Sequence, residues 1–180
     1  FYFVQLPNYR TVQTEPVEIS SWAAIREAQL NALHLEKTGM AVTIDVGEAA
    51  DIHPRNKSVV GKRLALTALA NTYGKNVEYS GPVFEKYSID GANIRISFSH
   101  CVGMKALDGG AIKGFSIAGV DHKFYFADAK VEGNCIVVSS PNVAFPVAVR
   151  YAWAANPVCN LVNAVDLPAG PFRTDNWNIY

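Results

Sequence analysis

Apolar positions in the first third of the chain change spacing from strand-like to helical and back. Residues 1–6 form an alternating hydrophobic run that predicts a strand, which ends at Pro7. Apolar residues at helical spacing follow and predict a helix that is N-capped by Ser20 or Ser21 and ends near Lys37. The predicted apolar face of this helix consists of Trp22, Ile25, Ala28, Ala32 and Leu33.

A second strand and helix follow the same scheme. Residues 40–44 are apolar without alternation, which is typical of a strand covered on both faces. After a polar loop, the spacing predicts a helix over residues 57–73, with Gly74 just beyond it. The order strand, helix, strand, helix predicts a βαβα unit with two parallel strands. The expected apolar face of the second helix is Val59, Val60, Leu64, Leu66, Leu69, Ala70 and Tyr73, and the expected solvent face is Lys57, Lys62, Arg63, Asn71 and Lys75.

From residue 79 onward the apolar period is near two, and Gly and Asn become frequent. This pattern predicts seven short strands and tight turns at Asp90-Gly91 and Glu132-Gly133, which favours an antiparallel β-sandwich. The change of pattern predicts an α/β part at residues 1–76 and a β part at 77–180, whose tail after Asn156 is extended. The expected strands are 83–89, 93–98, 111–117, 123–126, 127–132, 135–139 and 147–153.

Composition and charge narrow the class of partner. Sixteen Lys and Arg balance sixteen Asp and Glu, so the formal net charge is zero and nucleic acid is not expected as a partner. No apolar run approaches the roughly 20 residues that span a bilayer, so no membrane span is expected. Cys101, Cys135 and Cys159 are widely spaced, and two interpretations stay open: three buried free thiols, or one disulfide and one free thiol.

The loop after residue 44 holds the candidate chemistry. It carries Asp45, Glu48, Asp51 and His53, and ligands bind outside the carboxyl ends of strands in open α/β sheets. A loop imidazole can act as a general base, and Pro54 would stiffen its backbone. The competing interpretation is a histidine that only caps the following helix. The spacing of these groups is not that of a calcium loop or a zinc motif, so no metal and no other cofactor is implied.

Three other features are predicted to be structural. Residues 114–119 read GFSIAG, but the second glycine is one position too far for a nucleophile elbow, and Ser116 is therefore expected on a strand. His34 is expected at a helix surface or end. Tyr87, Tyr125 and Trp153 could form a platform for sugars, although core packing is the favoured interpretation for each of them.

Two separated motifs carry a resemblance to a known family. The first reads DIHP at residues 51–54, followed by NK at 56–57 and VGKRLAL at 60–66. The second comprises YAWA at 151–154, NP at 156–157, NL at 160–161 and LPAGPFRTD at 167–175. In this order the motifs are similar to the C-terminal part of the sialate O-acetylesterases, a branch of the SGNH-type serine hydrolases.

The resemblance implies a fold and an activity. Residues 1–76 would be the last βαβα piece of a flavodoxin-like SGNH hydrolase domain, and residues 77–180 an accessory β-sandwich. The complete enzyme would remove O-acetyl groups from sialic acid or a related acetylated sugar. Such enzymes take their nucleophilic serine from an upstream Gly-Gln-Ser-type motif, which this sequence lacks. We therefore expect a fragment or processed product that is inactive alone and that partners the N-terminal remainder of the catalytic domain.

Within the resemblance, His53 would be the general base and Asp51 the acid that orients it. The broader SGNH pattern has the acid three positions before the histidine, where this chain has Ala50, so Asp51 could instead only cap the loop. Asp45, at the strand end, would support the site indirectly. A periplasmic or secreted location follows from the family's glycan substrates. The rival interpretations are a carbohydrate-binding or structural β-module and one subunit of a cleaved two-chain esterase.

Overall fold

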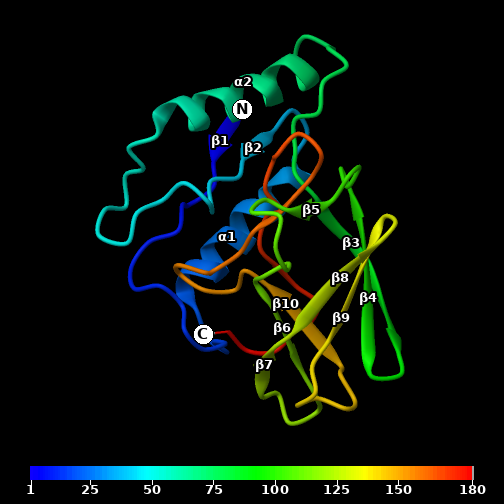
Figure 1. Cartoon of the computed structure of the whole chain (residues 1–180). Coiled ribbons are helices and arrows are strands. Elements are labelled where there is room, and N and C mark those ends of the chain that lie inside the picture. Colours follow the sequence, from blue (N-terminus) through cyan, green and yellow to red (C-terminus); the bar gives the residue numbers. More distant parts are fainter. Residues whose placement is uncertain (180) are drawn as a thin grey trace.

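The computed structural model describes residues 1–179, which form mainly antiparallel sheet together with two α-helices (Figure 1). The N-terminal part begins with a short two-stranded sheet whose strands pair in parallel, with Tyr2 opposite Gly39. The predicted strand–helix–strand–helix order is therefore confirmed. Its elements are β1 (Tyr2–Val4), α1 (Ser21–Asn31), the 3₁₀ turn η1 (Ala32–His34), β2 (Gly39–Ala41) and α2 (Lys57–Asn71).

The C-terminal part contains two four-stranded antiparallel sheets and one small strand pair. The first sheet has the order β3-β4-β9-β8, with β3 (Val83–Asp90), β4 (Asn93–Ser99), β8 (Asp128–Glu132) and β9 (Cys135–Ser139). The second has the order β12-β10-β6-β7, with β6 (Phe115–Ala118), β7 (Phe124–Phe126), β10 (Ala148–Tyr151) and β12 (Phe172–Arg173). The small pair joins β5 (Lys105–Ala106) to β11 (Leu161–Val162).

Glycines at the expected turns close the two hairpins of the first sheet. Gly91 and Gly133 have φ of 58° and 61°, and each begins a two-residue connection between paired strands. These turns, predicted from the sequence, are confirmed. The strand expected at 111–117 begins only at Phe115, because the side chain of Asn160 binds the carbonyl of Ala111 and the amide of Lys113 and holds residues 111–113 as a loop.

One apolar core lies between the two four-stranded sheets. In β4 and β9 buried residues alternate with half-exposed ones, so Ile94, Ile96, Ile136 and Val138 point to the core from one side. From the other sheet, Phe115, Ile117, Val149, Tyr151 and Phe172 enter the same core. All four residues of β6 and of β10 are buried. Burial of both faces of these two strands places the second sheet at the centre of the molecule.

Helix α1 packs differently from the prediction. Ser20 is the N-cap, as expected, and its hydroxyl accepts from the amide of Ala23 at 3.2 Å. However, the buried residues are Ala23, Ala24 and Arg26, whereas Ile25 and Leu33 of the predicted face are exposed. The two alanines contact Trp153 and Ile179 in the second core cluster, and their small side chains permit this close approach. The predicted apolar face was therefore wrong.

Helix α2 also turns a polar stripe inward. Its buried residues are Arg63 and Thr67, so the expectation that Arg63 lies in solvent was wrong. Thr67 lies so close to β2 that a Cβ at Gly39 would overlap it, which explains the glycine at that position. Leu69 and Tyr73, predicted to be buried, are exposed on the opposite side. Within residues 1–179, neither helix is long and apolar enough to cross a bilayer.

A buried ion pair fastens the C-terminal tail to β10. The guanidinium of Arg150 donates from Nε and Nη2 to the two carboxylate oxygens of Asp175 at 2.8 Å each, and both side chains are 1% exposed. Burial alone would raise the pKa of Asp175, but the hydrogen bonds and charge of Arg150 hold that pKa below its ordinary value. The tail is therefore held in place by this buried ion pair.

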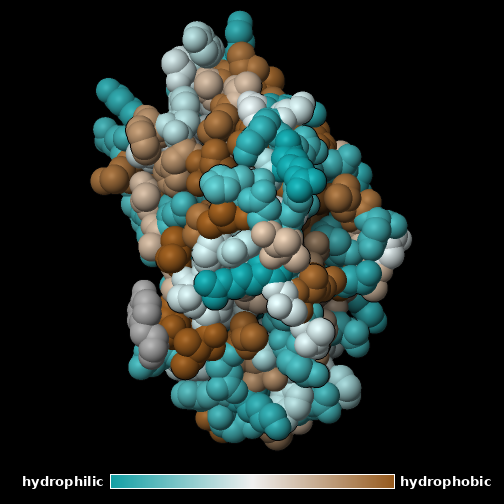
Figure 2. All heavy atoms as spheres, turned by 90° about the vertical axis from the view of Figure 1, so that its left-hand side faces the viewer, coloured by the Kyte–Doolittle hydropathy of each residue, from teal (hydrophilic) through white to brown (hydrophobic). Residues whose placement is uncertain are grey.

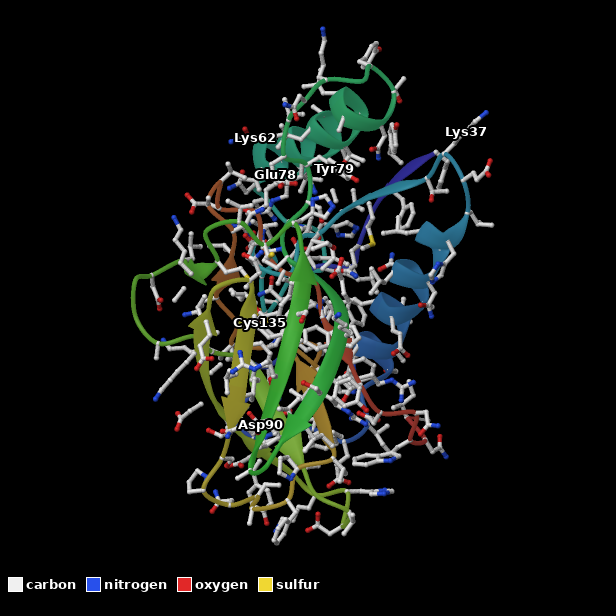
Figure 3. The ribbon with its side chains drawn as sticks, turned by 90° about the vertical axis from the view of Figure 1, so that its right-hand side faces the viewer. Lys37, Lys62, Glu78, Tyr79, Asp90 and Cys135 are labelled. Carbon is white, nitrogen blue, oxygen red and sulfur yellow. The ribbon has the colours of Figure 1, made fainter. Side chains whose placement is uncertain are left out.

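Contacts join the two predicted parts of the chain. Figure 3 shows Glu78 and Tyr79 between α2 and the β3–β4 hairpin, with Asp90 toward the far end of that hairpin. Arg173 of β12 donates to Glu27 of α1 at 2.7 Å, and Arg150 of β10 donates to the carbonyl of Glu18 at 2.5 Å. The division at residues 76 and 77 stays a prediction, because these contacts pass from one part to the other.

The buried pair of Arg150 and Asp175 predicts a pH-dependent loss of stability. Because the pKa of Asp175 is lower in the folded than in the unfolded chain, protonation favours unfolding, so the contribution is complete at pH 7 and is lost as the pH falls below about 4. We expect Asp175→Asn to lower the free energy of unfolding by about 3 kcal/mol at pH 7 and by clearly less at pH 3. Urea titrations at both pH values measure this, and an equal loss at both would contradict the assignment.

Candidate functional site

Two long loops leave the same edge of the short parallel sheet. The segment of residues 5–20 follows β1, and the segment of residues 42–56 follows β2. Because the strands are parallel, both segments start at the carboxyl ends of their strands, and Figure 1 shows them together on its left-hand side. The loop after β2 carries the predicted residues Asp45, Glu48, Asp51 and His53. The candidate site is therefore built on the edge where the sequence placed it.

Asp51 and His53 contact each other. One carboxylate oxygen, Oδ1 of Asp51, accepts the backbone N–H of His53 at 2.8 Å and lies 3.3 Å from its Nδ1. The backbone hydrogen bond, followed by the interaction with the imidazole, lowers the pKa of Asp51. Asp51 thus caps the loop and also lies beside the imidazole, and its role as the acid of a catalytic triad stays a prediction.

The imidazole is open to solvent. The side chain of His53 is 82% exposed and that of Asp51 is 44% exposed. Nδ1 is the nitrogen that faces Asp51, and within residues 1–179 the other nitrogen, Nε2, makes no hydrogen bond. An imidazole held at Nδ1 and free at Nε2 can accept a proton from a group brought to Nε2.

The remaining carboxylates of the loop have structural partners. The carboxylate of Asp45 accepts a hydrogen bond from each terminal nitrogen of Arg63, both at 2.6 Å. Arg63 also donates to the carbonyl of Val42 at 2.8 Å. Glu48 lies 3.4 Å from Nε of Arg55 and accepts the Arg55 amide at 3.3 Å. The expectation that Asp45 supports the site indirectly fits this geometry. Among the described residues, no group of three His, Cys, Asp or Glu is placed to hold a metal ion.

The neighbouring segment is attached to this loop by polar contacts. Asn8 accepts the amide of Gly47 at 2.6 Å, and a Cβ at Gly47 would overlap the Asn8 backbone carbonyl. Two residues further along, the Arg10 amide donates to the carbonyl of Ala49 at 3.0 Å. Arg10 adopts a φ of 74°, which is rare for a residue with a side chain. The glycine at position 47 permits the close approach of the Asn8 backbone. The two loops therefore form one surface.

A buried arginine holds this surface to the rest of the molecule. The guanidinium of Arg26, which is 0% exposed, donates to the carbonyls of Leu6, Pro7, Ala154 and Ala155 at 2.6–2.9 Å. Burial lowers the pKa of Arg26 to about 10. Sequence reasoning missed Arg26 and Arg63, because both stand at helical positions where a charged residue normally faces water. In hindsight, Asp45, which follows the predicted strand at residues 40–44, was the signal for a buried arginine nearby, here Arg63.

Other predicted residues lie elsewhere. Ser116 is on β6 and 7% exposed, as expected for a strand serine rather than a nucleophile elbow. His34 is exposed at the end of η1, also as expected. Trp153 is 3% exposed and belongs to the core, whereas Tyr87 is 40% exposed on β3. All three cysteines are free, and burial raises the pKa of Cys159 to about 12, which makes that thiol unreactive.

Known proteins with similar sequence and structure are acetylesterases. A crystal structure described as a novel carbohydrate acetylesterase from Xanthomonas citri has a TM-score of 0.93 and 46% identity over 98% of this chain, which covers 41% of that chain. The chain thus spans less than half of the length of that acetylesterase. The sialate O-acetylesterase of Rattus norvegicus is 28% identical over 192 residues, 96% of this chain and 35% of the rat protein. The resemblance to the sialate O-acetylesterases is confirmed. No protein-family model matches.

The ion pair between Arg63 and Asp45 predicts how firmly the loop is held. Replacing Arg63 by methionine keeps an apolar stem but leaves the carboxylate of Asp45, which is 21% exposed, without its counter-charge. We expect a loss of about 2–3 kcal/mol in the free energy of unfolding, measured by urea titration at pH 7. The matched control is Lys62→Met at the exposed neighbouring position, with a change of about 0.5 kcal/mol or less. Equal effects of the two variants would show that the pair does not hold the loop.

Proposed function

We propose that this chain is part of a serine esterase that removes O-acetyl groups from sialic acid or a related acetylated carbohydrate. The observation that carries the proposal is the exposed imidazole of His53, oriented at Nδ1 by Asp51 on the loop after β2, in a chain whose relatives are acetylesterases. The chain spans 35% of the rat relative and 41% of the bacterial one, so this activity is proposed for the whole protein and not for the chain alone.

His53 would act in each of two displacement steps, first as a general base and then as a general acid. In the first step, Nε2 takes the hydroxyl proton of a serine as the serine oxygen bonds to the acetyl carbonyl carbon. The imidazolium then returns the proton to the sugar oxygen as the C–O bond to the sugar breaks. In the second step, Nε2 takes a proton from water as the water oxygen bonds to the acetyl carbon, and the imidazolium returns this proton to the serine oxygen as the acetyl–serine bond breaks and acetate leaves. The carboxylate of Asp51 stabilises the imidazolium in both steps.

The nucleophilic serine and the oxyanion-hole donors would come from the rest of the catalytic domain. Residues 1–76 are then the last βαβα piece of an SGNH-type α/β domain, and the two four-stranded sheets are its accessory β-sandwich. Two features of the α/β part support the proposal that the rest of the catalytic domain packs against it. Within residues 1–179 the β1–β2 sheet has two strands, and two large apolar side chains are exposed, Leu69 of α2 at 38% and Tyr73 just beyond α2 at 69%. The glycan substrates of such an enzyme favour a periplasmic or secreted location.

Acetate release from 4-nitrophenyl acetate tests the assignment of His53. We expect a parent protein with the upstream segment to turn the ester over and the 180-residue chain to be inactive or nearly so. In the parent, His53→Ala should lower kcat/KM by about 10³-fold or more, because the serine loses its base. His34→Ala removes another exposed histidine and is the matched control, with no change expected.

Two results would contradict parts of this proposal. Turnover by the 180-residue chain itself, abolished by His53→Ala, would mean that one of its own serines is the nucleophile. A parent protein that keeps its activity after His53→Ala would remove His53 from the mechanism. Asp51→Asn separates the two roles of Asp51, since an orienting acid affects the pH profile of kcat/KM and a loop cap affects only stability.

A further inference from the structure

The candidate catalytic loop, residues 42–56 with His53, lies on the surface of the molecule. Figure 2 looks onto the side that carries both this loop and the segment after β1, and polar and apolar residues are mixed over it. Of residues 46–56, only Pro54 is buried. A loop with so few buried residues is not fixed by packing, so its position depends on its hydrogen bonds.

Few hydrogen bonds tie this loop to other segments. Arg63 holds its beginning through the ion pair with Asp45. Among the described residues, two hydrogen bonds join residues 46–55 to another segment, and both reach the segment after β1. They run from the Gly47 amide to Oδ1 of Asn8 and from the Arg10 amide to the carbonyl of Ala49. These two bonds therefore hold the middle of the loop.

One side chain of the β part binds both Asn8 and Arg10. Oδ1 of Asn156 accepts a hydrogen bond from Nδ2 of Asn8 at 2.9 Å, and Nδ2 of Asn156 donates to the carbonyl of Arg10 at 2.7 Å. Each of these partners in turn binds the loop, at Gly47 and at Ala49. Two paths of hydrogen bonds therefore lead from the Asn156 amide to the candidate catalytic loop.

Asn156 is itself held firmly. It is 5% exposed, and its carbonyl accepts the amide of Gln13 at 2.9 Å. The carbonyl of the preceding residue, Ala155, accepts Nη2 of Arg26 at 2.9 Å and the amide of Tyr9 at 3.1 Å. Removal of a buried amide leaves its partners without hydrogen bonds of equal quality. Asn156 therefore gives the loop a fixed point of attachment.

The position of Asn156 requires a side chain that both donates and accepts. One partner presents an N–H and the other a carbonyl, and a side-chain amide has a group for each. A carboxylate would lack the donor, and an apolar side chain would lack both groups. Asn156 belongs to the NP pair at 156–157 in the second sequence motif, whereas His53 belongs to the first. The hydrogen bonds thus connect two motifs that lie far apart in the chain.

We propose that Asn156 is a positioning residue for the candidate catalytic loop and that it acts through Asn8 and Arg10. This inference rests on the proposed function, because the position of the loop affects catalysis only if His53 acts on a serine. A general base must lie within hydrogen-bond reach of the proton that it takes, and a displacement of about 1 Å can lower the rate about 100-fold. The β part then supplies a contact that the esterase reaction needs.

The test compares two buried asparagines in the parent protein. Asn163 is 1% exposed and also uses both ends of its amide. Its partners are Ser80, His100, Val165 and Leu167, all outside the candidate catalytic loop and the segment after β1. We expect Asn156→Ala to lower kcat for 4-nitrophenyl acetate about 10- to 100-fold with KM nearly unchanged. Asn163→Ala is the matched control, with a lower melting temperature and an unchanged kcat. Both are assayed at a temperature at which circular dichroism shows them folded.

A second variant and a second measurement follow the proposed path. Asn8→Ala removes one of the two paths and should lower kcat in the same direction but by less. The double variant Asn8→Ala with Asn156→Ala should lose less than the product of the two single losses, because both act by one route. Hydrogen exchange, followed by mass spectrometry on peptides that cover residues 45–50, reports the loop itself. Exchange there should be faster in Asn156→Ala than in Asn163→Ala, whether or not the protein is an esterase.

These results distinguish failure of the positioning role from failure of the proposed function. If His53→Ala abolishes activity but Asn156→Ala changes kcat no more than Asn163→Ala does, the esterase stands and the positioning role is overturned. Faster exchange of the loop with an unchanged kcat would overturn it as well. If the parent keeps its activity after His53→Ala, the proposed function fails and the role of Asn156 in catalysis fails with it, even where faster exchange shows that the contact holds the loop.

Discussion

The buried guanidinium of Arg26 is the interaction on which the candidate site depends. From α1 it reaches Leu6 and Pro7 in the segment after β1, and Ala154 and Ala155 after the core residue Trp153, so it joins three segments far apart in the chain. Its four acceptors are all backbone carbonyls. Even with its pKa lowered to about 10, the group stays charged at neutral pH. Arg26 thereby helps to fix the segment that contains Asn8 and Arg10, together with Asn156, whose side chain binds both of these residues.

Arg26 has two counterparts that work in the same way. Arg63 ties α2 to the end of β2, and Arg150 ties β10 to the C-terminal tail. Each places a planar group with several donors where segments of irregular backbone meet, and such segments leave carbonyls and carboxylates that need partners. The apolar core between the two sheets gives the β part its cohesion, whereas these three arginines fix how the loops lie around it.

The elements that could be predicted from the sequence are those whose signal is local. The alternation of apolar and polar residues in β4 and β9, with glycines after Asp90 and Glu132, was sufficient to predict the two hairpins. This was possible because the geometry of a turn and the pleat of a strand are determined by a few neighbouring residues. The helices were found for the same reason, but their orientation was not. Ile25 and Tyr73 are exposed while arginines are buried, since the partners of those arginines lie up to 129 residues away. In the candidate site, the loop with Asp51 and His53 was found, whereas Arg10 and Asn156 carry no local signal.

The tail that ends beside α1 has a consequence for how this protein could have arisen. Ile179 packs on Ala23 and Ala24, and Arg173 pairs with Glu27, so the last strand of the β part and the first helix of the chain share one interface. A gene segment that encoded residues 77–180 alone would lack the helix that covers its central sheet. Such a segment could not easily have been exchanged between unrelated proteins as an independent module. The β part and the α/β part are expected to have been inherited together, with changes in one face followed by compensating changes in the other.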